Sequence, residues 1–242
     1  MIPDYIAERI RRAPPPGVRV VARSTPVIAF GDVRRSKVAT LGWNPSKLEF
    51  LDNSGMLLDG SRRLETTASL IADGLALDSP EAITRVFEAC NGYFQLRPYR
   101  RWFDVLEKVL RHVGASYYDG SACHLDLVQW ATDPVWGKLQ EHEQRTLLKS
   151  DIPFLSEQLA QENIRVLLLN GAGIMQAYQS HLSGHLIEVT ESANGRLRVF
   201  TNRPNPNLTV VGWNINLQSS WGVSNEEIGS IGKQVGMIVN RP

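Results

Sequence analysis

The sequence predicts an α/β protein, a three-layer α/β/α sandwich whose central sheet has four mostly parallel strands. Short apolar segments alternate along the chain with segments of helical periodicity, a pattern typical of strands joined by crossover helices. Residues 164–170 are almost continuously apolar, as expected for a strand covered by helices on both faces. The chain has 242 residues, 43% of them hydrophobic. It can therefore bury one full core, and we expect a single domain over residues 1–242.

The first half of the chain contains two of the four expected strands, residues 37–42 and 122–128. Residues 18–21 and 26–30 are expected to be short extended pieces. Helical spacing indicates helices at residues 5–12, 64–76, 79–90 and 102–114. Ser79 can cap the third of these helices, and Pro80 suits its first turn. Gly114 can close the fourth helix.

The second half supplies the other two strands, residues 164–170 and 208–213. Residues 141–161 are mostly helical, with an interruption expected near Pro153, and residues 171–182 suit a helix. Residues 186–189 and 197–200 flank Asn194-Gly195, a strong signal for a β-hairpin. Ser224 and Glu227 form the Ser-x-x-Glu pattern of a capping box, so a last helix is expected to begin there.

Composition excludes few functions. The net charge is +1 and 21% of the residues are charged, so no global signature of a nucleic-acid binder is present, although such proteins can confine positive charge to one face. Cys90 and Cys123 are the two cysteines and form no Cys-x-x-Cys pair, which argues against a disulfide framework or a structural zinc site. The N-terminus lacks a signal-peptide pattern and the apolar runs are too short to span a bilayer. We therefore expect a soluble, cytoplasmic monomer without membrane contact.

Polar residues stand at or near the ends of the four strands. They are Asn44, His124 with Asp126, Asn170, and Asn214 with Asn216. If the strands are parallel neighbours, these side chains meet on one rim of the sheet, where open α/β sheets bind ligands. The alternative is that each residue caps the next helix or satisfies a turn.

The segment Gly42-Trp43-Asn44-Pro45-Ser46 follows the first of these strands. Glycine permits close approach of a ligand or another backbone. Proline fixes its own φ and keeps Asn44 out of the helical region. The segment therefore presents a rigid carboxamide at the strand end, a group that can orient a water molecule.

These motifs resemble those of the uracil-DNA glycosylase superfamily over roughly residues 37–225. Residues 42–46 resemble the Gly-x-Asn-Pro-Gly motif of its mismatch-specific and thymine-DNA glycosylase branches. Residues 126–130, Asp-Leu-Val-Gln-Trp, are similar to an Asn-Val-Val-Lys-Trp segment, and residues 166–169 resemble the apolar third strand. Residues 214–220, Asn-Ile-Asn-Leu-Gln-Ser-Ser, resemble the Asn-Pro-Ser-Gly-Leu-Ser loop.

The resemblance implies a hydrolase that cleaves the N-glycosidic bond of a base flipped out of double-stranded DNA, in repair or in defence against modified foreign DNA, without a metal or cofactor. It implies that Asn44 positions the water and that Asn214 stabilises the departing base. His124 and Asp126 are residues i and i+2 of a strand and share a face, so we expect His124 to protonate the base or to orient Asp126. Base contacts are expected from Asp126, Phe50, Trp43 and Asn170, with Tyr93 and Trp130 as rival stacking platforms. DNA contacts are expected from Ser46, Asn216, Leu217, Gln218, Ser219 and Ser220.

Two positions depart from the family pattern. Ile215 replaces the proline of the last motif, and Asp126 replaces the asparagine that reads the base. An ionised carboxylate only accepts hydrogen bonds, so Asp126 favours a base with an exocyclic amine, such as cytosine or a modified cytosine. Structural roles are the alternatives: Asp126 can anchor a neighbouring amide or arginine, His124 can be a satisfied core histidine, and the aromatic rings can be core residues.

Two other functions remain open from the sequence. One is a hydrolase or transferase of small nucleosides, nucleotides or sugars that uses the same strand ends. The other is a non-catalytic nucleic-acid-binding module. The chain contains no Gly-rich phosphate loop, Gly-x-Ser-x-Gly elbow or metal-spaced histidine cluster that would name a different enzyme class.

Overall fold

The computed structural model describes residues 1–59, 63–96, 98–182, 184–191, 196–218 and 222–240. Two compact units make up the chain, and each draws on three separate segments. Unit 1 comprises Met1–Asp32, Trp43–Pro98 and Leu125–Gln161, and unit 2 comprises Val33–Gly42, Tyr99–His124 and Glu162–Pro242. The single domain expected from the sequence stays a prediction.

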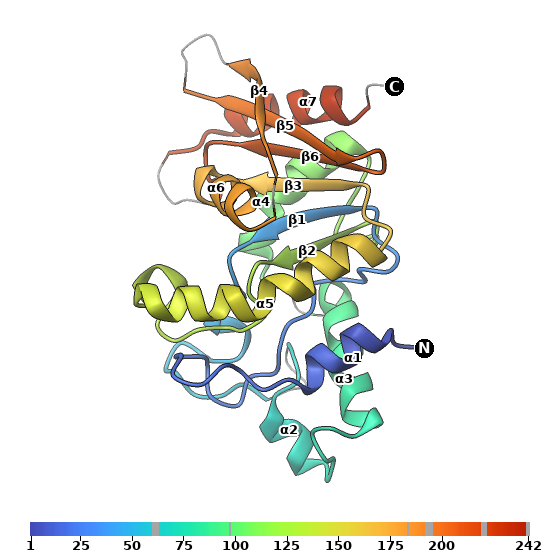
Figure 1. The fold of residues 1–242 in the computed structure, drawn as a ribbon, viewed down its shortest axis with the longest axis vertical. Helices are drawn as coiled ribbons and strands as arrows, with labels where there is room; N and C mark the ends of the chain where they lie inside the picture. The colour runs from blue at the N-terminus through green and yellow to red at the C-terminus, as the bar shows by residue number, and fades with distance from the viewer. Residues whose placement is uncertain (60–62, 97, 183, 192–195, 219–221, 241–242) are drawn as a thin grey trace. The chain divides into compact units, whose positions relative to one another are not determined.

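One sheet of six strands dominates unit 2 (Figure 1). The strands are β1 (Val38–Gly42), β2 (Ala122–Asp126), β3 (Val166–Asn170), β4 (Ile187–Glu191), β5 (Arg198–Asn205) and β6 (Leu208–Trp213), in the order β2-β1-β3-β6-β5-β4. All of them belong to unit 2 except the last two residues of β2. β1, β3 and β6 run parallel, whereas β5 is antiparallel to both β6 and β4.

The predicted α/β class is confirmed, but the prediction of a four-stranded, mostly parallel sheet is wrong, because the sheet has six strands of mixed orientation. The strands β4 and β5 were expected only as a hairpin, and they extend the same sheet because β5 pairs along β6 from Val199↔Trp213 to Asn205↔Leu208. The turn of the expected hairpin, Asn194-Gly195, lies outside the described residues. At the centre, all five residues of β3 are buried, as its continuous apolar sequence predicts.

Helices lie on both sides of this sheet within unit 2: α6 (Ala172–His181) on one side, and α4 (Arg100–Leu110) with α7 (Asn225–Val239) on the other (Figure 1). Gly212 of β6 permits the close approach of α6, because a Cβ there would lie 2.7 Å from the sulfur of Met175. The predicted capping box of α7 is confirmed: the Ser224 hydroxyl accepts from the Glu227 nitrogen at 3.1 Å, and the Glu227 carboxylate accepts from the Ser224 nitrogen at 2.9 Å.

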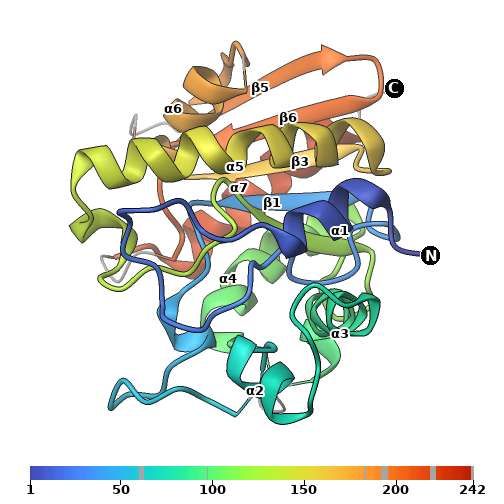
Figure 2. The ribbon, with the colours of Figure 1, turned by 60° about the horizontal axis from the view of Figure 1, so that its bottom comes forward.

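Unit 1 is built from helices and long connecting segments. Its helices are α1 (Asp4–Arg11), α2 (Thr67–Ala72), α3 (Pro80–Asn91) and α5 (Glu141–Gln161), and α1 packs against α3 and α5 (Figure 2). The Ser79 cap of α3 is confirmed by a 3.2 Å bond from the Ala82 nitrogen. Residues 18–21 and 26–30 form no strand. Each segment contains one isolated bridge position: Val20, which pairs with Thr132, and Phe30.

Two helix predictions in unit 1 are wrong. The helix expected over residues 64–76 is shorter, because Thr66 and Ser69 form a capping box at its start and Gly74 takes a φ of +78° just after its end. The interruption expected near Pro153 is absent from α5, which continues through this residue. A proline removes one backbone donor, and the remaining bonds of this 21-residue helix keep it continuous.

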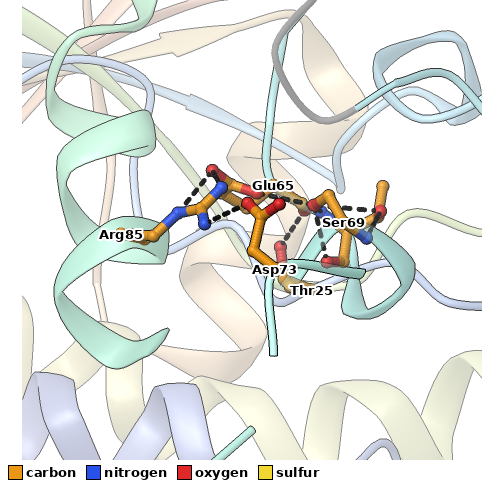
Figure 3. A network of polar contacts seen from close by, with 6 residues as sticks. Thr25, Glu65, Ser69, Asp73 and Arg85 are labelled. Atoms are coloured by element: carbon orange, nitrogen blue, oxygen red, sulfur yellow. Dashed lines mark hydrogen bonds and ion pairs between the residues drawn. The ribbon is translucent and has the colours of Figure 1, made fainter. Parts of the chain in front are cut away.

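A polar network holds α2 to α3 and to the segment before them (Figure 3). The Glu65 carboxylate accepts from Arg85 of α3 at 2.6 Å and from the Ser69 hydroxyl at 2.6 Å, while its backbone carbonyl accepts from Thr25 at 2.7 Å. Arg85 also contacts Asp73 at 2.5 Å. These contacts serve the fold of unit 1.

Within the part of the chain that the structure describes, no helix has the length and apolar character needed to cross a membrane.

Candidate functional site

The segment that follows β1 carries the first predicted site residues, and it belongs to unit 1 from Trp43 onward. Ser46 caps the short 3-10 helix η1 (Lys47–Glu49), since its hydroxyl accepts from the Leu48 nitrogen at 3.2 Å. Lys47 pairs with Asp133 at 2.9 Å on the surface. Ser46 is exposed, so its side chain is accessible for the DNA contact that the sequence predicts.

Asn44 is held in one orientation by its amide nitrogen. Nδ2 donates to the carbonyl of Trp130 at 3.1 Å, to the hydroxyl of Thr132 at 3.2 Å and to the carbonyl of Pro45 at 3.2 Å. Among the described residues, no donor reaches Oδ1 of Asn44. The result is a fixed carboxamide with its acceptor oxygen available, which is the geometry required to orient a water molecule.

The structure brings Asn44 and Asp126 to neighbouring segments. The Val128 nitrogen donates to the carbonyl of Trp43 at 3.0 Å, so the chain after β1 runs beside the chain after β2. Asp126 ends β2 and is 5% exposed. Its backbone carbonyl accepts from Nε2 of Gln129 at 2.8 Å.

Glu49 is a site residue that the sequence reasoning missed. It is 2% exposed, and its Oε2 accepts from the Tyr93 hydroxyl at 2.9 Å and from Arg63 at 3.3 Å. Burial raises the pKa of the Glu49 carboxyl; Arg63 and Tyr93 oppose the rise, and Asp126 adds to it. Glu49 and Asp126 therefore form a pair of carboxyl groups close enough to interact electrostatically.

No local pattern marks Glu49, because a glutamate in a Lys-Leu-Glu-Phe segment is typical of an exposed turn. The only sequence signal was its place five residues after Asn44. Its burial results from contacts with residues 14 and 44 positions further along the chain, Arg63 and Tyr93.

The predicted stacking residues divide into two groups by exposure. Phe50, Tyr93 and Trp130 are 0%, 1% and 4% exposed, so each ring is packed in the core, and Phe50 could stack on a base only by leaving that packing. Trp43 is half-buried and stacks on Trp136, with ring centroids 5.3 Å apart and planes at 20°. This pair is the aromatic surface beside Asn44 in unit 1.

His124 lies in unit 2, inside a buried chain of hydroxyl groups. Its Nδ1 is 2.6 Å from the Thr40 hydroxyl, which is 2.5 Å from the Tyr117 hydroxyl, and the ring of Phe103 meets its imidazole edge-to-face at 5.4 Å. Burial raises the pKa of Tyr117 well above its ordinary value, so the phenol stays protonated. These contacts agree with the structural alternative for His124, in which it is a hydrogen-bonded histidine of the core.

Asn170 organises the loop after β6 in unit 2. Its Nδ2 donates to the side-chain oxygens of Asn216 at 2.9 Å and Gln218 at 3.0 Å. Its Oδ1 accepts from the Trp213 indole at 3.0 Å and the Leu217 nitrogen at 2.9 Å. With four bonds inside this unit, the Asn170 side chain acts as the anchor of the loop.

The other residues of this loop also have structural partners. Both ends of the Asn214 carboxamide bond the backbone at the start of β5, accepting from Arg198 at 2.9 Å and donating to Arg196 at 3.0 Å. The catalytic role expected of Asn214 would require these bonds to break. Leu217 is 3% exposed, so a wedge role would require it to leave its packing. Ser219 and Ser220 lie outside the described residues.

The described residues contain no group of three or more histidine, cysteine, aspartate or glutamate side chains placed to hold a metal ion. In comparisons with known proteins, the sequence matches no family model and no curated protein. The arrangement in unit 1 is therefore interpreted from its own chemistry: a fixed amide oxygen, two interacting carboxyl groups and a half-buried pair of indoles.

Proposed function

We propose that this protein is a DNA glycosylase related to the uracil-DNA glycosylase superfamily, acting as a monomer on double-stranded DNA. Its substrate is a flipped-out base of the cytosine type, whose N-glycosidic bond it hydrolyses. The observation that carries the proposal is the Asn44 carboxamide, held through Nδ2 by Trp130 and Thr132 so that Oδ1 can bind water.

In this proposal the base first leaves the duplex, at a cost of a few kcal/mol. The bond between C1′ of the sugar and the base nitrogen breaks, and its electron pair stays with the base. The water held by Asn44 then forms the new bond to C1′. One proton of that water is transferred, directly or through a carboxyl group, to the departing base. Asn44 orients the water and cannot itself take the proton at neutral pH.

The two carboxyl groups supply the remaining chemistry. Asp126 accepts from the exocyclic amine of the base, which would discriminate against uracil by about 1–3 kcal/mol. Burial raises the pKa of the Glu49 carboxyl, and we assign the proton transfer to this group because positioned carboxyl groups act as general acids and bases. The stacked Trp43 and Trp136 offer an aromatic face for a base, a contact that contributes about 1–3 kcal/mol.

The loop that Asn170 anchors supports the DNA-binding part of the proposal. Asn216 and Gln218 are bonded to Asn170, and Gln218 also donates to the carbonyl of Trp102 at 3.0 Å. A loop fixed in this way loses little conformational entropy when it contacts a partner. We therefore assign Asn216 and Gln218 to DNA contacts.

The test is an abasic-site assay on duplexes that carry uracil, mismatched thymine, cytosine or modified cytosines. We expect strand cleavage after alkali treatment only with cytosine-type bases, and its loss in Asn44→Ala with DNA binding retained. Asn53→Ala, in an exposed turn of the same unit, is the matched control.

Full activity of Asn44→Ala would remove Asn44 from the mechanism. Salt-dependent binding without abasic sites would indicate a binding module, and hydrolysis of free nucleosides alone would indicate a small-molecule enzyme.

A further inference from the structure

A buried ion pair joins the N-terminal helix of unit 1 to its longest helix. Nη2 of Arg9 in α1 lies 2.9 Å from Oδ2 of Asp151 in α5, and the two side chains are 1% and 0% exposed. Two further atoms of the pair, Nη1 of Arg9 and Oδ1 of Asp151, are buried without a hydrogen-bond partner among the described residues. Such a pair is costly to bury, so its stabilising effect alone does not explain it.

The same pair holds the segment that follows β2. Oδ2 of Asp151 accepts from the Gln129 nitrogen at 2.9 Å, and Nε of Arg9 donates to Oε1 of Gln129 at 3.3 Å. The guanidinium of Arg9 also lies over the ring of Trp130, 5.2 Å from its centroid. Arg9 and Asp151 therefore hold the backbone nitrogen of Gln129 and the side chains of Gln129 and Trp130.

Each of the two candidate site residues is one hydrogen bond from this segment. The Trp130 carbonyl accepts from Nδ2 of Asn44 at 3.1 Å, and Nε2 of Gln129 donates to the Asp126 carbonyl at 2.8 Å. A displacement of residues 129 and 130 would move the acceptor of Asn44 and the anchor of Asp126 together. Displacements of about 1 Å can reduce a catalytic rate by about a hundredfold.

We propose that Arg9 is a positioning residue that, through Asp151, Gln129 and Trp130, sets the orientation of the Asn44 carboxamide and the place of Asp126. This inference rests on the proposed function for its effect on turnover, but the orientation of Asn44 can be measured without it. Arg9→Lys is the informative variant, because lysine retains the charge opposite Asp151 and loses the planar fork that reaches Gln129 and covers Trp130.

The matched control is Arg19→Lys. Arg19 also pairs with a carboxylate of α5, that of Glu143, at 2.5 Å, but its side chain is 49% exposed. Its guanidinium donates to both oxygens of Glu143. Two readouts are needed. The first is the side-chain amide NMR signal of Asn44, assigned by its loss in Asn44→Ala, with the amide of Asn170 as an internal reference. The second is the turnover and DNA affinity of each variant on a modified-cytosine duplex.

We expect Arg9→Lys to shift the Asn44 amide signal and speed its hydrogen exchange, leave the Asn170 signal unchanged, and lower kcat about tenfold or more with little change in Kd. Arg19→Lys should change neither readout. An unchanged Asn44 signal in folded Arg9→Lys, or a shifted signal with unchanged kcat, would overturn the proposal. If the wild type makes no abasic sites, the proposed function fails, while the amide signals still decide whether Arg9 orients Asn44.

If Arg9→Lys does not fold, the double variant Arg9→Met with Asp151→Asn replaces it. This pair leaves no uncompensated charge in the core and retains an acceptor for the Gln129 nitrogen. The same shift of the Asn44 signal is expected, and its absence would overturn the proposal.

Discussion

Glu49 and Asp126 lie close enough in unit 1 for the charge of Asp126 to raise the pKa of the Glu49 carboxyl. Glu49 is in η1 and Asp126 ends β2, so 77 positions of sequence separate them. Burial is the larger cause of the raised pKa, and the two effects act in the same direction. Enzymes that cleave glycosidic bonds commonly employ two carboxyl groups, and the proposed function assigns proton transfer to Glu49 and base recognition to Asp126.

The base preference is expected to depend on Asp126. Asp126→Asn replaces an acceptor-only group by one that also donates, so the preference should move from cytosine-type bases toward uracil. A change of about 1–3 kcal/mol in relative kcat/KM is expected, measured by competition between the two duplexes. Asp78→Asn, at an exposed position, is the control. An unchanged ratio would contradict a base-reading role for Asp126.

Thr132 is expected to contribute to turnover through Asn44. Thr132→Val removes the hydroxyl that accepts from Nδ2 at 3.2 Å and keeps a similar volume. Loss of one such bond is worth about 1 kcal/mol, so kcat should fall roughly fivefold with DNA affinity unchanged. Single-turnover kinetics measure this effect. Thr84→Val on the surface of α3 serves as the control, and equal rates in both variants would rule out the effect.

The Glu49 carboxyl makes stability depend on pH. Because its folded-state pKa is raised above the ordinary value of 4.5, the folded protein binds this proton more tightly than the unfolded chain does. The wild type therefore loses stability as the pH rises from 4.5 through the raised pKa. Glu49→Gln abolishes this titration, so its free energy of unfolding should increase relative to the wild type over that range.

Urea denaturation at a series of pH values tests this prediction. Glu8→Gln, on the exposed face of α1, is the control, and its free energy of unfolding should show the same pH dependence as that of the wild type. If the difference in free energy of unfolding between Glu49→Gln and the wild type stays constant across this pH range, the folded and unfolded states bind the Glu49 proton equally, and the prediction is wrong.

Gly171 directly follows β3 in unit 2, and a side chain at this position is expected to strain the contact with the loop that Asn170 anchors. Its φ is +96°, and a Cβ would lie 3.1–3.2 Å from atoms of Asn216. Gly171→Ala should destabilise the protein by about 1–3 kcal/mol and disturb the Asn216 contact with Asn170. Gly137→Ala, where a Cβ meets nothing within 4 Å, is the matched control. Thermal unfolding compares them, and equal melting temperatures would disprove the strain at Gly171.

Features that depend on short stretches of sequence were predictable. The buried strand β3, the capping box of Ser224 and Glu227 and the Ser79 cap all follow from local patterns. The turn at Asn44 was found in the same way. The pairing of β5 with β6 was not predicted, because a hairpin pattern in the sequence does not indicate which other strand of the sheet pairs with the hairpin.

By itself, the sequence determined the α/β class, the cores of the main helices and strands, and the place of Asn44 at a strand end. Only the tertiary structure decided that Glu49 is buried within the electrostatic reach of Asp126 and that Asn214 is bonded to the start of β5. It also decided that Arg9 and Asp151 bond Gln129, the residue next to the Trp130 carbonyl that accepts from Asn44. The physical reason is that periodicity and capping act within a few residues. Burial, charge interaction and hydrogen-bond pairing instead depend on residues that the fold brings together from distant positions.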